Sequence, residues 1–474
     1  MTEERKEELR QLLEEAMRTV VIEAPEGYEP ISVDTYKKHL MSLRKQYRPD
    51  LTSLTRSYYH PKIHNEAIKS KLLEFIIAEF KGFINEEHGN WIQPASYGIG
   101  NGGSDAGQPV EMLLRKLLQI AIAGGEQRAI VAFEKSIGET KGSFRRIILL
   151  QGLGTHPEDS HKLTEIQICE GVRLIYLPYD PQKLPPYLFD HGFSSLHFQS
   201  NPGIFMGKAI IVIDCEVSPL FIKPEFGAPT VHSDGSKSYS AKEDAYPFQI
   251  SIKSTEFPEF DVDQFCQVIS LTCNFDCVTI LDWGYIDPDE LFSVVGQGII
   301  PTARCVLPNE PVSFNRISET QIPEIKRRYE ILTNLDSETR EKLQIPIDRW
   351  IKSKAEDNPV DKIIDLGIAL ESLYVPAKVP GKSRKIVHNL KKNASGYLGK
   401  NKENREKLKE KFKVIYDCRC DAVHEGRLGD SVTIDGESIT MSRFIEKAQN
   451  LCLDSIIKIL EDGKFPDWNN LILG

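Results

Sequence analysis

The sequence predicts a multidomain α+β protein in which a helical and mixed α/β N-terminal region precedes a C-terminal all-α helical bundle. Three observations lead to this fold class. Apolar residues recur at helical spacing near both ends of the 474-residue chain. Between the ends, short runs of β-branched residues are bounded by Gly, Pro, Asp or Asn, which is typical of strands. Segment 307–324 contains three prolines and little periodicity, and it separates the middle of the chain from the last helical region.

The first predicted part, residues 1–90, is a helical segment. Apolar residues have helical spacing in 3–20, 33–47 and 64–86, and the last of these ranges carries the strongest stripe. That stripe consists of Leu72, Leu73, Phe75, Ile76, Ile77, Phe80, Phe83 and Ile84. The charged first residues lack the apolar core of a signal peptide, and no run of 18 apolar residues occurs. We therefore expect a cytoplasmic protein without a membrane span.

The second predicted part, residues 91–312, is a β-rich mixed α/β domain. Helices are expected at 109–123 and 261–273. Strands are expected at 144–151, 172–177, 208–215, 247–253 and 277–285. Glycines 98, 100 and 103 match a dinucleotide-binding pattern, but no strand precedes them, so we interpret 94–108 as a flexible loop. No nucleophile–base motif or metal-ligand cluster occurs in this domain, which favours a sensor or targeting role.

Charge and cysteine content limit the chemistry that the chain can perform. The net charge of −10 means that any contact with nucleic acid must come from a local basic surface. The nine cysteines include no CxxC pair, so we expect no zinc site. Their odd number without framework spacing is typical of a reducing cytosol. We expect neither a metal nor a cofactor.

The third predicted part, residues 318–474, carries the candidate functional residues. Helices are expected at 325–335, 337–353, 359–374, 401–424 and 439–462. In the helix that ends with FKVIYDCRCDAVHEG (412–426), Arg419 falls on an apolar stripe. The other members of that stripe are Leu408, Phe412, Ile415, Ala422 and Val423. A cation on such a stripe faces the bundle core or a partner surface, and it is costly there unless it is paired.

His424 follows Arg419 by five residues. On a straight helix this spacing separates the two residues by about 140° of rotation and about 7.5 Å of rise. One helix alone therefore does not bring the two side chains together. The length of the arginine side chain, the helix end near Gly426, or a second copy of the helix across a dimer axis could join them.

A strongly basic connector precedes this helix. Residues 376–415 contain thirteen Lys or Arg and three Glu, which gives a local charge of +10. Such a patch can follow a phosphate backbone, although charge runs are more often a solvated helix face. The candidates for substrate binding are Lys382, Arg384, Lys385, Lys391, Lys392 and Lys411.

Several segments, taken in order, resemble the Apea-like branch of the HEPN superfamily. They are RWIKS (349–353), DKIIDLGIALESLYV (361–375), the basic connector, RCDAVHEG (419–426) and FPDWNNLI (465–472). The resemblance extends over residues 320–474, and RCDAVHEG is close to the family's Arg-small-x-x-Val-His-x-Gly. Cys420 departs from that pattern, because many members carry Ser or Asn there, and Cys is a weaker hydrogen-bond partner.

The resemblance implies a C-terminal HEPN bundle that acts as a homodimer and cuts RNA without a metal. The 2′-OH of RNA would attack the adjacent phosphate, with His424 as acid or base and Arg419 facing the charged oxygens. Glu371 would orient Arg419 or His424, and a structural ion pair with another basic residue is the equal alternative. The resemblance further implies tRNA or mRNA as the target, in bacterial anti-phage defence or toxin-type growth arrest.

Two hypotheses remain open from the sequence. In the first, the chain is an RNA endoribonuclease, and the region before residue 318 restrains or directs it in response to a trigger ligand or a phage protein. In the second, the bundle is a catalytically silent HEPN module for dimerisation or ligand binding, and the function resides in the N-terminal region. The presence of both Arg419 and His424 favours the enzyme.

Overall fold

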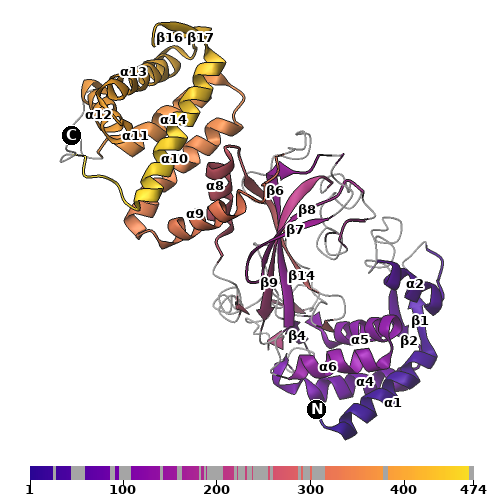
Figure 1. Ribbon diagram of the computed structural model, residues 1–474. Coiled ribbons are helices and arrows are strands. Elements are labelled where there is room, and N and C mark those ends of the chain that lie inside the picture. The colour runs from indigo at the N-terminus through magenta and orange to yellow at the C-terminus, as the bar shows by residue number, and fades with distance from the viewer. Residues whose placement is uncertain are drawn as a thin grey trace. The chain divides into compact units, whose positions relative to one another are not determined.

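The chain folds into two compact units, which the computed structural model in Figure 1 shows from the indigo N-terminus to the yellow C-terminus. The first unit contains Met1–Leu150, Gly154–Phe260 and Thr279–Phe314, and the second contains Gln151–Leu153, Asp261–Val278 and Asn315–Gly474. The structure describes residues 1–24, 28–43, 59–85, 91–94, 108–138, 142–156, 158, 163–180, 183–185, 188, 206–217, 221–222, 230–231, 237–238, 255–256, 260–286, 290–291, 299–301, 315–376 and 383–468. Helices and strands together confirm the mixed α+β class.

The first unit begins with a helical layer. Helix α1 (Glu3–Thr19) buries Leu9, Leu13 and Ala16 and contacts α4 (Glu66–Glu79) and α6 (Glu126–Ile137). Arg5 of α1 reinforces this packing, because its Nε lies 2.7 Å from Glu79 Oε1 and its guanidinium carbon lies 4.0 Å from the centre of the Phe75 ring. The other elements of the layer are α2 (Val33–Leu43), α5 (Val110–Gly124), and the antiparallel strands β1 (Val20–Glu23) and β2 (His60–Ile63).

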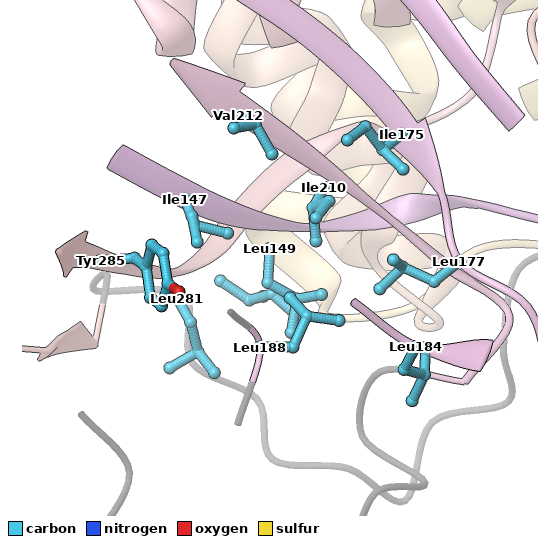
Figure 2. Close-up of a cluster of buried hydrophobic side chains, with 11 residues drawn as sticks. Ile147, Leu149, Ile175, Leu177, Leu184, Leu188, Ile210, Val212, Leu281 and Tyr285 are labelled. Carbon is cyan, nitrogen blue, oxygen red and sulfur yellow. The ribbon is translucent and has the colours of Figure 1, made fainter. Parts of the chain in front are cut away.

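The first unit also contains a twisted sheet of seven strands in the order β15-β14-β6-β9-β8-β7, with β13 beside β9. Its strands are β6 (Gly142–Gly154), β7 (Thr164–Cys169), β8 (Val172–Tyr176), β9 (Lys208–Val217), β13 (Thr255–Glu256), β14 (Val278–Ile286) and β15 (Ile299–Pro301). Figure 2 shows the apolar cluster on this sheet, in which Ile147, Ile175 and Ile210 lie on three different strands. Residues 147–150 of β6 and 209–213 of β9 are all buried, so these two strands bury side chains on both faces and supply much of the core of this unit.

Short elements complete the described part of the first unit. They are η1 (Lys81–Phe83), β3 (Ile84–Asn85), β4 (Trp91–Pro94), β5 (Gln108–Pro109), β10 (Phe221–Ile222), β11 (Thr230–Val231) and β12 (Lys237–Ser238). The predicted strands at 144–151, 172–177, 208–215 and 277–285 are confirmed as β6, β8, β9 and β14. The predicted strand 247–253 and residues 95–107 of the predicted loop lie outside the described residues.

The second unit is a helical bundle with one short hairpin. Its helices are α8 (Val262–Cys273), α9 (Ile322–Asn334), α10 (Ser337–Ala355), α11 (Pro359–Tyr374), α12 (Ser383–Leu398), α13 (Lys402–Glu425) and α14 (Met441–Asp462). Side-chain oxygens of Asp336, Asn358, Asn401 and Thr440 accept a backbone N–H at the start of α10, α11, α13 and α14. The hairpin of β16 (Ser431–Ile434) and β17 (Glu437–Thr440) lies between α13 and α14, so the bundle is not entirely α-helical. The first part of the basic connector, for which no helix was predicted, contains α12.

The predicted helix 261–273 is confirmed as α8, but it packs with the C-terminal bundle instead of the α/β domain. The Phe265 ring meets the Tyr329 ring edge-on at 5.5 Å between centroids, and the Tyr329 hydroxyl accepts the backbone N–H of Asp261 at 2.7 Å. Gln267 donates to Asp348 Oδ1 of α10 at 3.3 Å. These contacts give the bundle a helix that precedes residue 318 in the chain.

Two groups of side chains hold the bundle together. Trp350 of α10 is fully buried, and its Nε1 donates to the Gln449 carbonyl of α14 at 2.9 Å. Gln449 returns the contact by donating to the Ser353 carbonyl at 2.8 Å. After α14, the Trp468 ring lies 5.4 Å from the Tyr374 ring and 5.6 Å from the Tyr397 ring, between ring centroids. The final segment thereby joins the ends of α11 and α12.

We expect Trp350→Ala to lower the free energy of unfolding by about 3–5 kcal/mol, because it leaves a large cavity at the α10–α14 contact. Ile345→Ala on the same helix is the control, because Ile345 is 52% exposed, and its effect should stay within about 0.5 kcal/mol. Urea unfolding followed by circular dichroism measures both. Equal losses in the two variants would contradict the packing described here.

Candidate functional site

Helix α13 positions the candidate catalytic residues. Leu408, Phe412, Ile415 and Ala422 are buried as the apolar stripe predicts, and the Phe412 ring packs edge-on against Tyr374 of α11 at 5.7 Å between centroids. Val423 does not follow this prediction, because it is 47% exposed. The buried stripe therefore ends one turn before the helix does, and the last turn of α13 faces solvent.

Arg419 lies against α11 and is paired there with Glu371. The Arg419 Nε lies 3.6 Å from Glu371 Oε1, and each side chain is 24% exposed. This distance is too long for a hydrogen bond, and neither of these two atoms has a hydrogen-bond partner in the described part of the chain. The contact is therefore electrostatic. It supplies the pairing that a cation on a buried stripe requires.

Gly367 lies one turn before Glu371 on α11 and leaves space for the arginine. A Cβ atom at position 367 would lie 2.4 Å from the Arg419 Cγ and 3.1 Å from its Cβ. Since real carbon atoms do not approach so closely without a shift, the aliphatic part of Arg419 occupies the volume that a side chain at position 367 would fill.

Tyr416, one turn before Arg419, completes the surroundings of the ion pair. The Arg419 guanidinium carbon lies 5.9 Å from the centre of the Tyr416 ring, within the range of a cation–π contact. Burial raises the pKa of the Tyr416 hydroxyl, and the neighbouring Cys420 and Glu371 raise it further. Arg419, Glu371, Tyr416 and Cys420 thus form one polar group at the α11–α13 contact.

Glu371 is a carboxyl in a partly dry environment. Burial raises the pKa of the Glu371 carboxyl, and the Arg419 charge offsets this effect only in part. The desolvation of the carboxylate outweighs its attraction to a guanidinium 3.6 Å away. Glu371 is thus a carboxyl that holds a proton more readily than an exposed glutamate does.

His424 stands apart from this group. It is exposed in the last turn of α13, which ends at Gly426 in the left-handed conformation, with φ of 65°. Within the described residues, His424 forms no hydrogen bond and no ion pair, and neither Arg419 nor Glu371 is its partner. The structure of a single chain therefore brings Arg419 to Glu371 and does not bring His424 to either. Asp421 is also exposed on this helix.

The candidate basic residues have different surroundings. Lys382 and the side chains of Arg384 and Lys385 lie outside the described residues, although α12 includes positions 384 and 385. Lys391 is half-buried and Lys392 is exposed on α12, and neither has an ion-pair partner in the described ranges. Lys411 Nζ lies 3.8 Å from Asp435 Oδ2 at the hairpin turn.

Most other lysines of α13 are paired along their own helix. Ion pairs join Lys407 to Glu403, Lys409 to Glu406, and Lys413 to Glu410. Exposed pairs of this kind are weak and screened by salt, but they reduce the net charge that α13 presents. Among the described side chains of the connector, Lys391 and Lys392 on α12, Lys400 between the two helices and Lys402 on α13 form no ion pair.

Gly367 and Tyr416 were not among the site residues predicted from the sequence. Both could have been found from spacing, since Gly367 precedes Glu371 by four residues and Tyr416 precedes Arg419 by three. Within the described residues, no group of three or more His, Cys, Asp or Glu side chains is arranged to hold a metal ion. No helix in the same ranges is long and apolar enough to cross a membrane.

Comparisons of this chain with protein-family models, with curated proteins and with solved structures found no significant match. The geometry of the second unit and the sequence motifs within it are therefore the basis on which a function can be proposed.

The raised pKa of Glu371 predicts a pH-dependent effect of its substitution. In the folded protein the pKa of the Glu371 carboxyl is higher than its ordinary value of 4.5. The free energy of unfolding therefore falls as the pH rises from that value through the folded pKa, because the carboxyl then loses its proton in the folded state. Glutamine has no such proton to lose. The stability of Glu371→Gln relative to the parent should therefore increase between about pH 4 and about pH 7.

Thermal unfolding at a series of pH values measures this difference, with Glu437→Gln as the control because Glu437 is exposed in the hairpin. The control should show a smaller change with pH. A relative stability of Glu371→Gln that stays constant or falls toward neutral pH would contradict the burial assigned to this carboxyl.

Proposed function

We propose that the second unit is a metal-independent RNA endoribonuclease of the HEPN type. The observation that carries the proposal is the position of Arg419, which is on α13 together with His424 and lies against α11, where Glu371 Oε1 is 3.6 Å from its Nε. A half-buried arginine at a helix contact is costly, and a phosphate-binding role gives a reason to keep it. The order of segments that resembles the Apea-like HEPN branch supports the same function.

These groups suit the chemistry of RNA cleavage. RNA carries its own nucleophile, the 2′-OH, which can attack the adjacent phosphorus. Such a step needs a group that moves a proton near neutral pH and a cation that faces the charged phosphate oxygens. His424 is exposed and accessible for the first role. Arg419 provides a planar fork of donors for the second.

The proposed active form is a homodimer through α13. His424 and Arg419 are about 140° apart around a straight helix, and within the described residues His424 forms no hydrogen bond or ion pair with Arg419 or Glu371. A two-fold axis beside the last turns of α13 would place His424 of one copy near Arg419 of the other. Val423, which is 47% exposed next to His424, provides an apolar contact for such an interface.

The proposed substrate is tRNA or mRNA, and the basic face of α12 with Lys391 and Lys392 is its proposed backbone contact. The proposed setting is the bacterial cytoplasm, in anti-phage defence or toxin-type growth arrest. In this proposal the first unit senses a trigger ligand or a phage protein, or it selects the target.

Substitution of either proposed catalytic residue should abolish cleavage without unfolding the protein. We expect His424→Ala to lower the cleavage rate of labelled tRNA in EDTA by about 10²–10⁴-fold, the contribution typical of a general acid or base, and Arg419→Ala to do the same. Asp421→Ala is the matched control, because Asp421 is exposed on the same helix between the two. It should keep its rate within a few-fold of the parent.

Retained cleavage in both alanine variants would show that the catalytic assignment is wrong. A parent protein that binds RNA or dimerises but cuts nothing would favour the alternative of a silent HEPN module. Inhibition by EDTA that Mg²⁺ or Mn²⁺ reverses would indicate a metal-dependent nuclease elsewhere in the chain.

Mixing the two inactive variants tests whether the site is shared between copies. In a mixed dimer with shared sites, the Arg419→Ala chain still has His424 and the His424→Ala chain still has Arg419. These two side chains form one intact site. After random exchange, about a quarter of the parent activity should return, because half of the dimers are mixed and each has one site of two. No return of activity, although an affinity tag on one variant retrieves the other after exchange, would contradict the shared site.

The restraining or directing role of the first unit can be tested with a fragment that keeps α8. A fragment that joins residues 261–278 by a flexible linker to residues 315–474 retains this helix and leaves out the rest of β14 and β15, whereas one beginning at Ser318 would lose the helix. We expect the linked fragment to cleave RNA faster than the full chain, or with a different choice of substrate. Identical rates and identical products would refute a regulatory role for the first unit.

A further inference from the structure

Gly367 lies in the interior of a helix, and the backbone conformation there does not require a glycine. It lies in the middle of α11, and its φ is not in the positive range that favours glycine. Glycine in a helix interior lowers stability relative to alanine, since it restricts the unfolded chain less. The residues around it on α11, Ile363, Leu366 and Leu370, are fully buried and suit a helix.

Among the described residues, Arg419 provides the atoms closest to the space beside Gly367. A Cβ at position 367 would meet the Arg419 Cγ at 2.4 Å, the Cβ at 3.1 Å and the Cδ at 3.4 Å, and these are its three nearest neighbours. Any other atom is therefore no closer than ordinary van der Waals distance. The overlap involves the base of the Arg419 side chain, so rotation of the guanidinium alone cannot remove it. The whole side chain would have to adopt another rotamer.

A different rotamer would direct the guanidinium away from its present position. From Gly367 the side chain now extends to Glu371, one turn further along α11, where Nε lies 3.6 Å from Oε1. Gly367 and Glu371 are four residues apart and therefore lie on the same face of α11. The first gives room to the aliphatic part of Arg419, and the second attracts its charge.

We propose that Gly367 is a positioning residue, which sets the direction of the Arg419 guanidinium by leaving the side-chain volume at position 367 empty. This inference rests on the proposed function for its effect on RNA cleavage, but the contact itself does not. A displacement of about 1 Å at a catalytic group can lower a rate by about 100-fold. Gly367→Ala should therefore impair cleavage although alanine favours the helix.

A double-mutant cycle between positions 367 and 419 tests the proposal in the full-length protein. The four proteins are the parent, Gly367→Ala, Arg419→Ala and the double variant. In Arg419→Ala the Cγ and Cδ are gone, so a methyl group at position 367 meets no overlap from them. Gly429→Ala is the control glycine, because a Cβ there would meet only the Ser431 carbonyl oxygen at 3.6 Å.

Stability provides a readout that does not depend on catalysis. Gly367→Ala should raise the midpoint of thermal unfolding in the Arg419→Ala background, where its helix preference is opposed only by the 3.1 Å approach to the Cβ of residue 419. In the parent background the rise should be smaller or reversed, because the methyl group forces Arg419 to move. Equal shifts in the two backgrounds would overturn the proposal, since the two residues would then be independent.

Activity provides the second readout. Gly367→Ala should lower kcat for RNA cleavage by about 100-fold, while circular dichroism stays like that of the parent and Gly429→Ala keeps full activity. Parent-like activity in Gly367→Ala would overturn the positioning role. If the parent cleaves no RNA, the proposed function fails, and the stability cycle still decides whether Gly367 holds Arg419 in place.

Discussion

The second unit depends on one constraint, which is that Arg419 of α13 must be paired with Glu371 of α11. A guanidinium on a stripe of buried residues costs free energy unless an opposite charge compensates it, and Glu371 provides that charge at 3.6 Å. Compensation is incomplete, because burial still raises the pKa of the Glu371 carboxyl. The packing of α11 against α13 must therefore support the pair, and it does so through the Tyr374–Phe412 ring contact. Trp468 closes over Tyr374 from the end of the chain. Replacing a buried ion pair by apolar residues is often neutral or stabilising, and this is the reason for which we propose a functional role for Arg419.

Much of the fold could be predicted from the sequence, because its helices and strands have clear apolar periodicities. The helices α9, α10, α11, α13 and α14 and the strands β6, β8, β9 and β14 lie close to their predicted ranges. The partner of α8 could not be predicted, because periodicity shows that a helix has an apolar face without showing what that face contacts. Helix α12 was not predicted, because the Lys and Arg residues of the connector resemble a solvated run of charge. The exposure of Val423 depends on where the α11–α13 contact ends, which its apolar side chain does not reveal.

The sequence predicted which residues belong to the candidate site, but it did not predict how their side chains are arranged. Glu371 was expected to orient Arg419 or His424, and the structure brings it to Arg419. The distance between Arg419 and His424 around the helix follows from helix geometry alone, and the exposed position of His424 preserves that separation. If two copies must meet to complete the site, association of the chains becomes a control point for the reaction. Such control suits a nuclease whose activity would be harmful when unrestrained, and the large first unit offers a place where it could act.

The central claim is that this protein cuts RNA by using the 2′-OH of the RNA itself. The most direct measurement compares an RNA oligonucleotide with a copy that carries a single 2′-deoxynucleotide on the 5′ side of the mapped cut, both incubated with the purified full-length protein in EDTA. The account predicts cleavage of the RNA to a 2′,3′-cyclic phosphate end and no cleavage at that position in the deoxy copy. Equal cleavage of both oligonucleotides would contradict the account, because water or a protein side chain would then have to be the nucleophile.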